Sequence, residues 1–328
     1  MILSRAPTRI TLGGGGTDLE SYYSKHGGFL IAGAINKYCT LLANRRFYND
    51  IRLSYSQMEI KDNVADIEHR IFQAALKLVG VEKGIELHSA ADVPAGCGLG
   101  TSSSFTVSLL NALHTYKKDF ISQKQLAEEA CCVEINILGE PIGKQDQYIA
   151  AFGGLTCLTF EQNGEVLVEP LRISHESLDQ LEGNILLFFT GKERSASEIL
   201  SDQDEKCKHN DPAMADNLHQ IKDIGLEIRK YLENEQVDML GELFHAHWEI
   251  KKKRSGGISD PFIDECYEVA RKNGAAGGKL IGAGGGGFLM FYCENSHKPQ
   301  LIENMQKMGL RWERFHFDFD GAKILVNT

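Results

Sequence analysis

Glycine and hydroxyl side chains gather in the segment 94–113, which reads PAGCGLGTSSSFTVSLLNAL. Glycine lets a backbone approach a ligand closely, and the apolar residues that follow have the spacing of a helix. The first backbone N–H groups of such a helix lack intrahelical partners, and together with the helix dipole they attract an anion. The segment therefore predicts a phosphate-binding loop, with a glycine-rich turn and a serine helix cap as the alternative.

Two further glycine runs suggest that this loop is not an isolated turn. RAPTRITLGGGGTDLESYY begins at residue 5 and GGKLIGAGGGGFLMFYC begins at residue 277, and each contains four consecutive glycines. No lysine follows the glycines of 94–104 as it would in a P-loop, and their spacing is not that of a dinucleotide-binding fingerprint. Three glycine-rich loops exceed what turns alone require, so we expect them to meet around one ligand site.

Three carboxylates are candidates for chemistry beside these loops. Asp146 follows a Gly-Lys-Gln turn and precedes an apolar helical pattern, where an N-cap is the ordinary role. Glu134 lies in a helical pattern, where a solvated surface carboxylate is the ordinary role. Asp18 follows the first glycine run, where a turn or cap residue is the ordinary role. The residues alone leave these alternatives open.

The elements that must position these residues are mixed strands and helices. Strand patterns cover 8–14, 27–46 and 84–93, and helical patterns cover 66–80 and 122–138. Asn163-Gly164 between two alternating runs predicts a hairpin. A new buried strand at 183–191 precedes helical patterns at 212–234, 237–253 and 261–273. We expect an α+β protein of two domains, 1–175 and 176–328.

Composition limits the partners and the compartment. The chain of 328 residues has a formal charge of −10, which disfavours nucleic acid or an anionic membrane as the main partner. Its eight cysteines form no Cys-x-x-Cys pair, so they predict buried thiols in a reducing cytoplasm. No apolar run reaches the roughly 20 residues that span a bilayer, and the segment MILSRAPTRI lacks the apolar block of a signal peptide.

Together the three motifs resemble those of the GHMP small-molecule kinases, in the same order and over almost the whole chain. The family pattern Pro-x-x-x-Gly-Leu-Gly-Ser/Thr-Ser-Ser is matched from Pro94 to Ser103 without a gap. The combination GGGGTD, GLGTSSSF and IGKQDQYIAAFGG is most similar to heptose 7-phosphate kinases, with fucose and galactose kinases as more distant relatives. The resemblance implies an N-terminal domain like domain 2 of ribosomal protein S5, a ferredoxin-like C-terminal domain, and a site between them.

The resemblance also implies a nucleotide and a metal. ATP is the family's usual donor, with GTP as an alternative, and its phosphates would lie against Pro94, Gly96, Gly98, Leu99, Gly100, Thr101, Ser102, Ser103 and Ser104. The family carries Mg²⁺ on a serine of this loop and a glutamate of a later helix, which match Ser102 and Glu134. Hard oxygen ligands suit Mg²⁺, which takes few protein groups.

The catalytic positions of the family are matched at two residues. Asp146 occupies the position of the catalytic base or orienting carboxylate, with Gly143 and Gln147 also matching the family pattern. Arg9 aligns with the basic residue that pairs with this aspartate and with the transferring phosphate. Because some relatives transfer phosphate without this carboxylate, an electrostatic role for Asp146 stays open.

The substrate-binding positions follow from the same resemblance. Asp18 would bind sugar hydroxyls, in a loop that also contains Gly15, Gly16 and Thr17, and Gly285 and Gly286 would approach the substrate from the third glycine run. A substrate that carries its own phosphate needs cations, and Lys192 and Arg194 in FTGKERSAS are the first candidates, with solvated side chains as the alternative. The run KKKR, 251–254, is expected to be a solvated helix end, with Arg254 as a lesser candidate.

The sequence therefore predicts an ATP-dependent kinase that phosphorylates the anomeric hydroxyl of a heptose 7-phosphate, for nucleotide-activated heptose. A kinase for a free sugar such as fucose or mannose is one alternative. A nucleotide- or sugar-binding regulator that has kept the fold without turnover is another. The presence of Ser102, Glu134, Asp146 and Arg9 together favours an enzyme, because a regulator has little reason to retain a charged group facing the acceptor.

Overall fold

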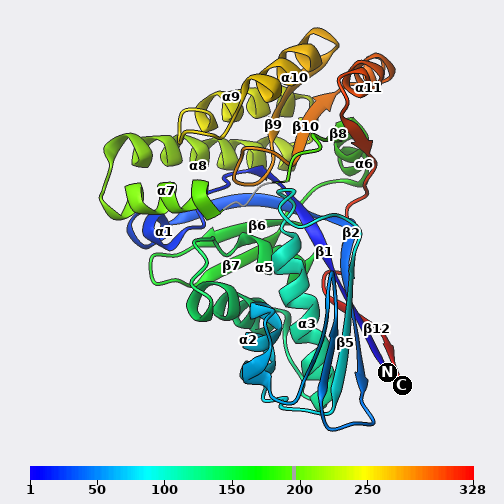
Figure 1. The fold of residues 1–328 in the computed structure, drawn as a ribbon. Helices are drawn as coiled ribbons and strands as arrows, with labels where there is room; N and C mark the ends of the chain where they lie inside the picture. The colour runs from blue at the N-terminus through cyan, green and yellow to red at the C-terminus, as the bar shows by residue number, and fades with distance from the viewer. Residues whose placement is uncertain (194–196) are drawn as a thin grey trace.

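The N-terminal part of the chain, joined by one strand from near the C-terminus, builds a mixed sheet of eight strands (Figure 1). In the computed structural model, which describes residues 1–193 and 197–328, the strand order is β12-β1-β2-β5-β3-β4, and β6 and β7 extend the sheet from β2. The strands are β1 (Ile2–Gly13), β2 (Gly28–Arg45), β3 (Ile51–Ser54), β4 (Met58–Lys61), β5 (Ile85–Ala91), β6 (Leu155–Phe160), β7 (Val166–Pro170) and β12 (Lys323–Asn327).

Strands β1 and β2 form the long antiparallel pair at the centre of this sheet. The helix α1 (Glu20–His26) and the glycine run 13–16 lie between them in the chain. The first part of β2 pairs with β6, and its second part pairs with β5. The ladder between β1 and β2 shifts between Pro7 and Thr8, which fits a proline that has no N–H to donate. This pair carries the first glycine run toward the second part of the molecule (Figure 1).

Helices pack against the same sheet and close the first core. Helix α3 contacts both β1 and β2, and its residues are largely buried because these strands and the neighbouring helices cover most of its sides. Neighbouring helices α2 and α5 flank α3, which begins directly after the glycines of residues 96–100. The helical segments here are η1 (Val64–Asp66), α2 (Arg70–Val79), α3 (Thr101–Lys117), α4 (Gln123–Cys131), η2 (Cys132–Ile137) and α5 (Gln145–Phe152).

A second sheet of four antiparallel strands has the order β11-β8-β10-β9. With helices between β8 and β9 and between β10 and β11, this is the ferredoxin-like arrangement. The strands are β8 (Ile185–Phe189), β9 (Ala275–Leu280), β10 (Phe288–Cys293) and β11 (Arg311–Glu313). The helical segments are α6 (His175–Asn184), α7 (Ser197–Lys208), α8 (Pro212–Glu233), η3 (Val237–Met239), α9 (Leu240–Lys251), α10 (Pro261–Lys272) and α11 (Lys298–Lys307).

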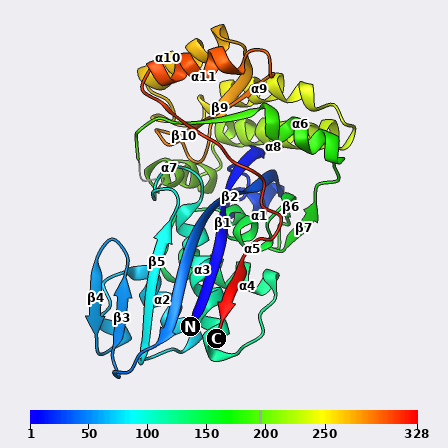
Figure 2. The ribbon, with the colours of Figure 1, turned by 90° about the vertical axis from the view of Figure 1, so that its right-hand side faces the viewer.

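The architecture confirms the α+β class, and it differs from the expected elements in two places. The helix expected over 122–138 changes at Cys132 into the π-helical segment η2, which contains Glu134. Strand β12 pairs with β1, so residues 323–327 return to the first sheet (Figure 2). The boundary near 175 stays a prediction. In the described part of the chain, no helix combines the length and the apolar character needed to cross a membrane.

Candidate active site

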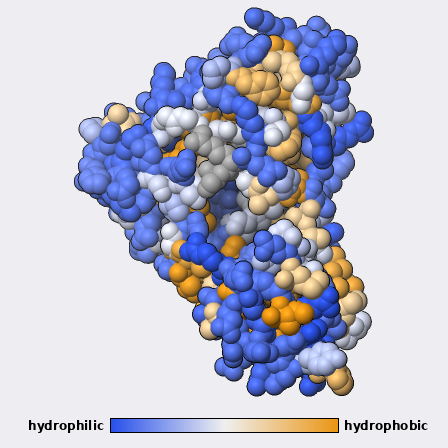
Figure 3. All heavy atoms as spheres, in the orientation of Figure 1, coloured by the Kyte–Doolittle hydropathy of each residue, from blue (hydrophilic) through white to orange (hydrophobic). Residues whose placement is uncertain are grey.

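A cavity of about 510 Å³ lies where the two parts of the molecule meet. The space-filling view shows a largely hydrophilic face that is hollowed between the upper and lower parts (Figure 3). The lining comes from β1, α2, α3, η2, α5, α7, α9 and β9, together with the loops after β1, before α3, after η2 and after β9. All three glycine-rich segments contribute to it, through Gly15 and Gly16, through Gly96, Gly98 and Gly100, and through Gly282.

The predicted phosphate-binding loop ends at Gly100, which is the N-cap of α3. Its φ of 76° lies in the left-handed region, and a Cβ there would lie 2.9 Å from Oδ2 of Asp146. No side chain caps this helix, so the serine-cap alternative is wrong. The uncapped amides of the first turn are available to an anion in the cavity. Six of the predicted nucleotide-binding residues line the cavity: Gly96, Gly98, Gly100, Thr101, Ser102 and Ser103.

Three of the predicted nucleotide-binding residues have contacts within the protein instead. The Ser104 hydroxyl donates hydrogen bonds to the carbonyls of Pro7 (2.7 Å) and Gly100 (3.0 Å). The Pro94 carbonyl accepts a bond from the Thr101 hydroxyl, and the buried Leu99 accepts one from the amide of Arg9. These residues fix the loop to β1 and do not line the cavity.

Glu134 on η2 and Ser102 at the start of α3, the two predicted metal ligands, are in direct contact. Ser102 Oγ donates to Glu134 Oε1 at 2.9 Å, and Gln147 Nε2 donates to Oε2 at 2.7 Å. Glu134 is almost fully buried, so it is not the solvated carboxylate of the alternative interpretation. Burial raises the pKa of Glu134 to about 7, against the hydrogen bonds from Ser103, Ser102 and Gln147, which lower it.

The residues around Glu134 fit a magnesium ion. A buried carboxylate with a hydroxyl beside it supplies the hard oxygen donors that Mg²⁺ prefers. Within residues 1–193 and 197–328, no group of three or more His, Cys, Asp or Glu side chains could hold a metal. The side-chain oxygen Oε1 of Gln147 is buried without a partner beside this pair. The π-helical turn aims Glu134 inward.

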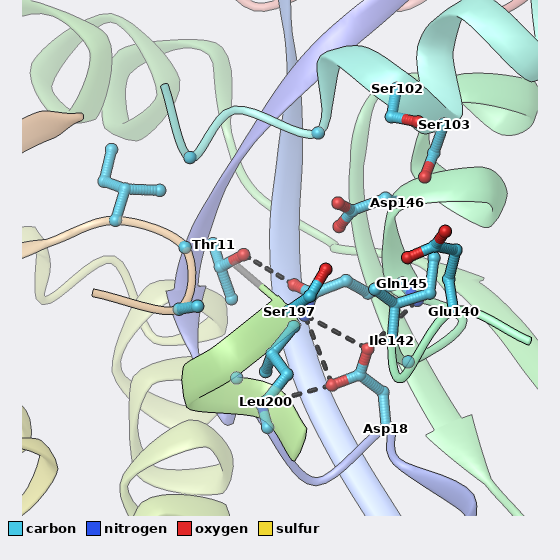
Figure 4. A pocket seen from close by; sticks show the side chains of 18 of the residues that line it. Thr11, Asp18, Ser102, Ser103, Glu140, Ile142, Gln145, Asp146, Ser197 and Leu200 are labelled. Atoms are coloured by element: carbon cyan, nitrogen blue, oxygen red, sulfur yellow. Dashed lines mark hydrogen bonds between the residues drawn. The ribbon is translucent and has the colours of Figure 1, made fainter. Parts of the chain in front are cut away.

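Arg9 and Asp146 form a bidentate ion pair in the cavity. Arg9 Nε and Nη2 donate to Asp146 Oδ1 and Oδ2 at 2.7 and 3.0 Å, and Nη1 donates to the Gly98 carbonyl at 2.6 Å. Asp146 lies in the first turn of α5, whose N-cap is Lys144, so an N-cap role for Asp146 is wrong. Figure 4 shows Asp146 between the α3 serines and the Asp18–Gln145 pair.

Asp18 is buried on the other side of Asp146. Its carboxylate accepts hydrogen bonds from the backbone N–H and the side-chain amide of Gln145 and from the amide of Gly16, all between 3.1 and 3.2 Å. Burial raises its pKa, and so does the negative charge of Asp146. Gln145 in turn accepts from the Thr11 hydroxyl at 2.6 Å (Figure 4). Thr17 does not line the cavity, because its hydroxyl is buried and donates to the carbonyls of Gly14 and Phe29.

Gln145 is one residue that sequence reasoning missed. Its position directly before Asp146 was the only signal. The larger omission is a group of basic side chains on the C-terminal side of the cavity, in which His247, Lys251 and Lys279 join Arg254, the one member that the sequence had offered as a lesser candidate. All four are buried, so the expectation that 251–254 is a solvated helix end is wrong for Lys251 and Arg254. The presence of Lys279 inside the third glycine motif was a signal that could have been followed.

Lys192, Gly285 and Gly286, which were predicted to bind a distal phosphate or the substrate, do not line the cavity. Lys192 forms an ion pair with Asp260 and lies 5.0 Å from the centre of the Phe262 ring. Arg194 lies outside the described residues. Gly285 donates its amide to the Ile258 carbonyl, and a Cβ on Gly286 would meet Lys192. From this motif the cavity is lined by Gly282 and Ala283.

Two family models match the chain: the GHMP kinases N terminal domain over residues 64–154 and the GHMP kinases C terminal domain over residues 228–309. The D-glycero-alpha-D-manno-heptose 7-phosphate kinase of Campylobacter jejuni is 31% identical over 98% of each chain. The bifunctional fucokinase/GDP-fucose pyrophosphorylase of Arabidopsis thaliana is 24% identical over 90% of this chain and 30% of that protein. The crystal structure of a D-glycero-D-manno-heptose 1-phosphate kinase from Bacteroides thetaiotaomicron has a TM-score of 0.83, with 26% identity and full coverage of both chains.

Proposed function

The chain belongs to the GHMP kinases, and from that membership we propose that it transfers the γ-phosphoryl group of ATP to the anomeric hydroxyl of D-glycero-D-manno-heptose 7-phosphate. The product is the 1,7-bisphosphate, an intermediate suited to nucleotide activation of the sugar. The observation that carries the proposal is the Arg9–Asp146 pair, which lies between the α3 amides and the loop of Asp18. That is where an acceptor hydroxyl and a transferring phosphate must meet.

The nucleotide phosphates bind at the first turn of α3 in this proposal. The amides of Thr101, Ser102 and Ser103 face the cavity without a side-chain cap, and the helix dipole adds a favourable field. Arg9 neutralises charge on the transferring group, because its guanidinium is held by Asp146 and Gly98 beside this loop. Ser102 and Glu134 would hold Mg²⁺, which supplies charge neutralisation at the phosphates.

Asp146 receives the proton of the anomeric hydroxyl. The sugar oxygen forms a bond to the γ-phosphorus, the bond from that phosphorus to the bridging oxygen breaks, and ADP leaves with the electron pair. Asp18 and Gln145 orient the sugar by accepting and donating hydrogen bonds to its ring hydroxyls. In this proposal the enzyme works in the cytoplasm. ATP is abundant there, and the eight free cysteines stay reduced.

One other acceptor class is favoured by a specific observation. The Arabidopsis relative is named a fucokinase, so a free sugar is the second candidate. The two heptose kinases among the relatives also differ in the substrate that they are named for. The Campylobacter jejuni protein is named a heptose 7-phosphate kinase, and the Bacteroides thetaiotaomicron protein is named a heptose 1-phosphate kinase. The higher sequence identity, 31% against 26%, favours the 7-phosphate as substrate.

The test measures ADP release from ATP with a panel of acceptors: D-glycero-D-manno-heptose 7-phosphate, the 1-phosphate, the free heptose, fucose and mannose. We expect kcat/KM to be highest for the 7-phosphate, and phosphorus NMR of the product to show a new anomeric phosphate. The Asp146→Asn variant is the control for turnover at this site. A higher kcat/KM for a free sugar, or no ADP release with any acceptor, would contradict the proposal.

A further inference from the structure

A group of buried basic side chains faces the cavity from the C-terminal part of the molecule. His247 and Lys251 lie four residues apart on one face of α9, Arg254 follows one turn later, and Lys279 lies on the adjacent strand β9. Their exposed fractions are 3, 6, 7 and 3%, and all four line the cavity. Long basic side chains are rarely buried unless they are paired, so the group needs an explanation.

The charged members of this group have no carboxylate partner. Within the part of the chain that the structure describes, Lys251, Arg254 and Lys279 form no ion pair. Lys251 Nζ donates to the carbonyls of Leu280 and Gly282, and Lys279 Nζ donates to the carbonyl of Leu12. An ammonium group has three N–H donors, so at least one donor remains on Lys251 and two remain on Lys279.

Arg254 and His247 have donors that are buried and unused. Arg254 Nε donates to Asn217 Oδ1 (3.0 Å), and Nη1 donates to the Gly15 carbonyl and Gln203 Oε1 (both 3.2 Å). Its Nη2 has no partner, and neither ring nitrogen of His247 has one. Unsatisfied buried polar atoms are costly, and several of them around one cavity point to a ligand with several acceptor oxygens.

Burial and mutual repulsion disfavour the protonated, charged forms of these basic side chains. Burial lowers the pKa values of Lys251 and Lys279 well below their ordinary range, and the neighbouring cations add to the effect. Burial also lowers the pKa of Arg254 to about 10. The helix dipole at the end of α9 favours cations nearby, which partly explains why a basic residue occupies position 251. It does not account for Lys279, which lies on a strand, or for the unpartnered Nη2 of Arg254.

The position of the group relative to the reacting centre limits which class of ligand it can bind. Arg254 Nη1 would lie 2.4 Å from a Cβ on Gly16, so its guanidinium lies directly against the sugar-binding loop. The phosphates of the nucleotide already have the α3 amides and Arg9. With a net charge of −10, a substrate that is itself a dianion must be met by local cations. Arg254 beside the sugar loop, with Lys251 and Lys279 in the same cavity, matches that requirement, because the negative charge of a bound phosphate favours the protonated forms of the two lysines.

We infer that His247, Lys251, Arg254 and Lys279 form the subsite for the phosphate ester that the sugar carries into the active site. The inference rests on the proposed function, in that it takes a sugar phosphate as the acceptor. The planar guanidinium of Arg254 offers its free Nη2 to a phosphate oxygen, and the two ammonium groups share the remaining charge. Selectivity for a phosphorylated sugar over a free sugar then depends on this subsite, because a free sugar leaves the cations unpaired.

The experiment compares Arg254→Lys and Lys251→Met with Lys252→Met. Lys252 adjoins Lys251 in the chain, and its ammonium pairs with Glu249 at 2.6 Å outside the cavity, so it is the matched control. Kinetics are measured with heptose 7-phosphate, free heptose and ATP as varied substrates, and each variant's melting temperature is recorded. We expect Arg254→Lys and Lys251→Met to raise KM for the sugar phosphate about 10- to 100-fold. KM for ATP and kcat/KM for free heptose should stay within about threefold of the wild type, as should all values for Lys252→Met.

An equal loss with the phosphorylated and the free sugar would overturn the inference, because it would place the cations on the transferred phosphate. An unchanged KM for the sugar phosphate would overturn it as well. A second measurement uses inorganic phosphate as the probe, by calorimetry with the nucleotide-free protein. Weaker phosphate binding in Arg254→Lys and Lys251→Met, but not in Lys252→Met, supports the subsite, and equal binding in all three overturns it. If the wild type binds phosphate at this group yet releases no ADP with heptose 7-phosphate, the proposed function fails and the anion subsite stands.

Discussion

The buried carboxylate of Glu134 should make the metal-free protein less stable as pH rises. Burial raises its pKa from 4.5 to about 7. Between these two values the unfolded chain has released the proton while the folded protein retains it, so stability falls as pH increases through this window. The difference between the two pKa values corresponds to about 3 kcal/mol. Below pH 4.5 both states are protonated, and Glu134 contributes no pH dependence.

The Glu134→Gln variant removes this titration while keeping a group that can bond to Ser102 and Gln147. The measurement is urea unfolding in the presence of EDTA, and the quantity compared is the free energy of unfolding of the variant minus that of the wild type. This difference should be about 3 kcal/mol larger at pH 8 than at pH 5. Glu140→Gln is the matched control, because Glu140 lines the same cavity but is only half-buried and pairs with Arg70 at 3.1 Å. Its effect should be below about 1 kcal/mol at either pH.

Magnesium should narrow the difference in stability between the two proteins at pH 8. A metal that binds the ionised carboxylate stabilises the folded wild type by about 1.4 kcal/mol at ten times its dissociation constant. The same concentration should leave Glu134→Gln unchanged, because the charged ligand is lost. Parallel urea curves for wild type and Glu134→Gln across pH 5 to 8 would refute the assigned titration. Equal stabilisation of both proteins by Mg²⁺ would refute the metal role.

Three further substitutions test the site. Asp146→Asn should lower kcat by about 10²–10⁴-fold and leave the dissociation constant for ATP nearly unchanged, which single-turnover kinetics and calorimetry can check. Gly100→Ala should lower kcat more than tenfold and stability by about 1–3 kcal/mol, since its φ of 76° disfavours a side chain and the new Cβ would contact Asp146. Ser104→Ala should lower the melting temperature while KM for ATP stays within about twofold, because its hydroxyl bonds to Pro7 and Gly100. Unchanged stability with weaker ATP binding would instead favour direct nucleotide contact by Ser104.

The local motifs of the site were readable because glycine and hydroxyl patterns reflect backbone geometry. The loop before α3 was predicted from its residues, and the positions of Arg9, Asp146 and Glu134 were predicted from the family resemblance; the structure brings them together. What periodicity could not supply was the π-helical turn at Cys132, because a helix with one extra residue in a turn has the same apolar pattern over so short a length.

The basic group in the C-terminal part was misjudged for a physical reason. A run such as KKKR after a helix is normally solvated, and sequence alone does not show which of its members points inward. Lys251 and Arg254 are buried while Lys252 is partly exposed, and this difference follows from the face of α9 that packs on β9. Lys279 was hidden in a strand whose neighbours are apolar. Only tertiary packing brings these residues beside the sugar loop.

The pairing of β12 with β1 has a consequence for how the chain folds during synthesis. A domain normally folds as a unit once its residues have left the ribosome, N-terminal domain first. Here the edge of β1 stays unpaired until residues 323–327 emerge, so the first sheet is completed only after the whole ferredoxin-like part has been made. During that interval β1 presents open N–H and C=O groups, which is the condition that favours mispairing with another nascent chain. Chaperone demand should therefore be highest late in translation.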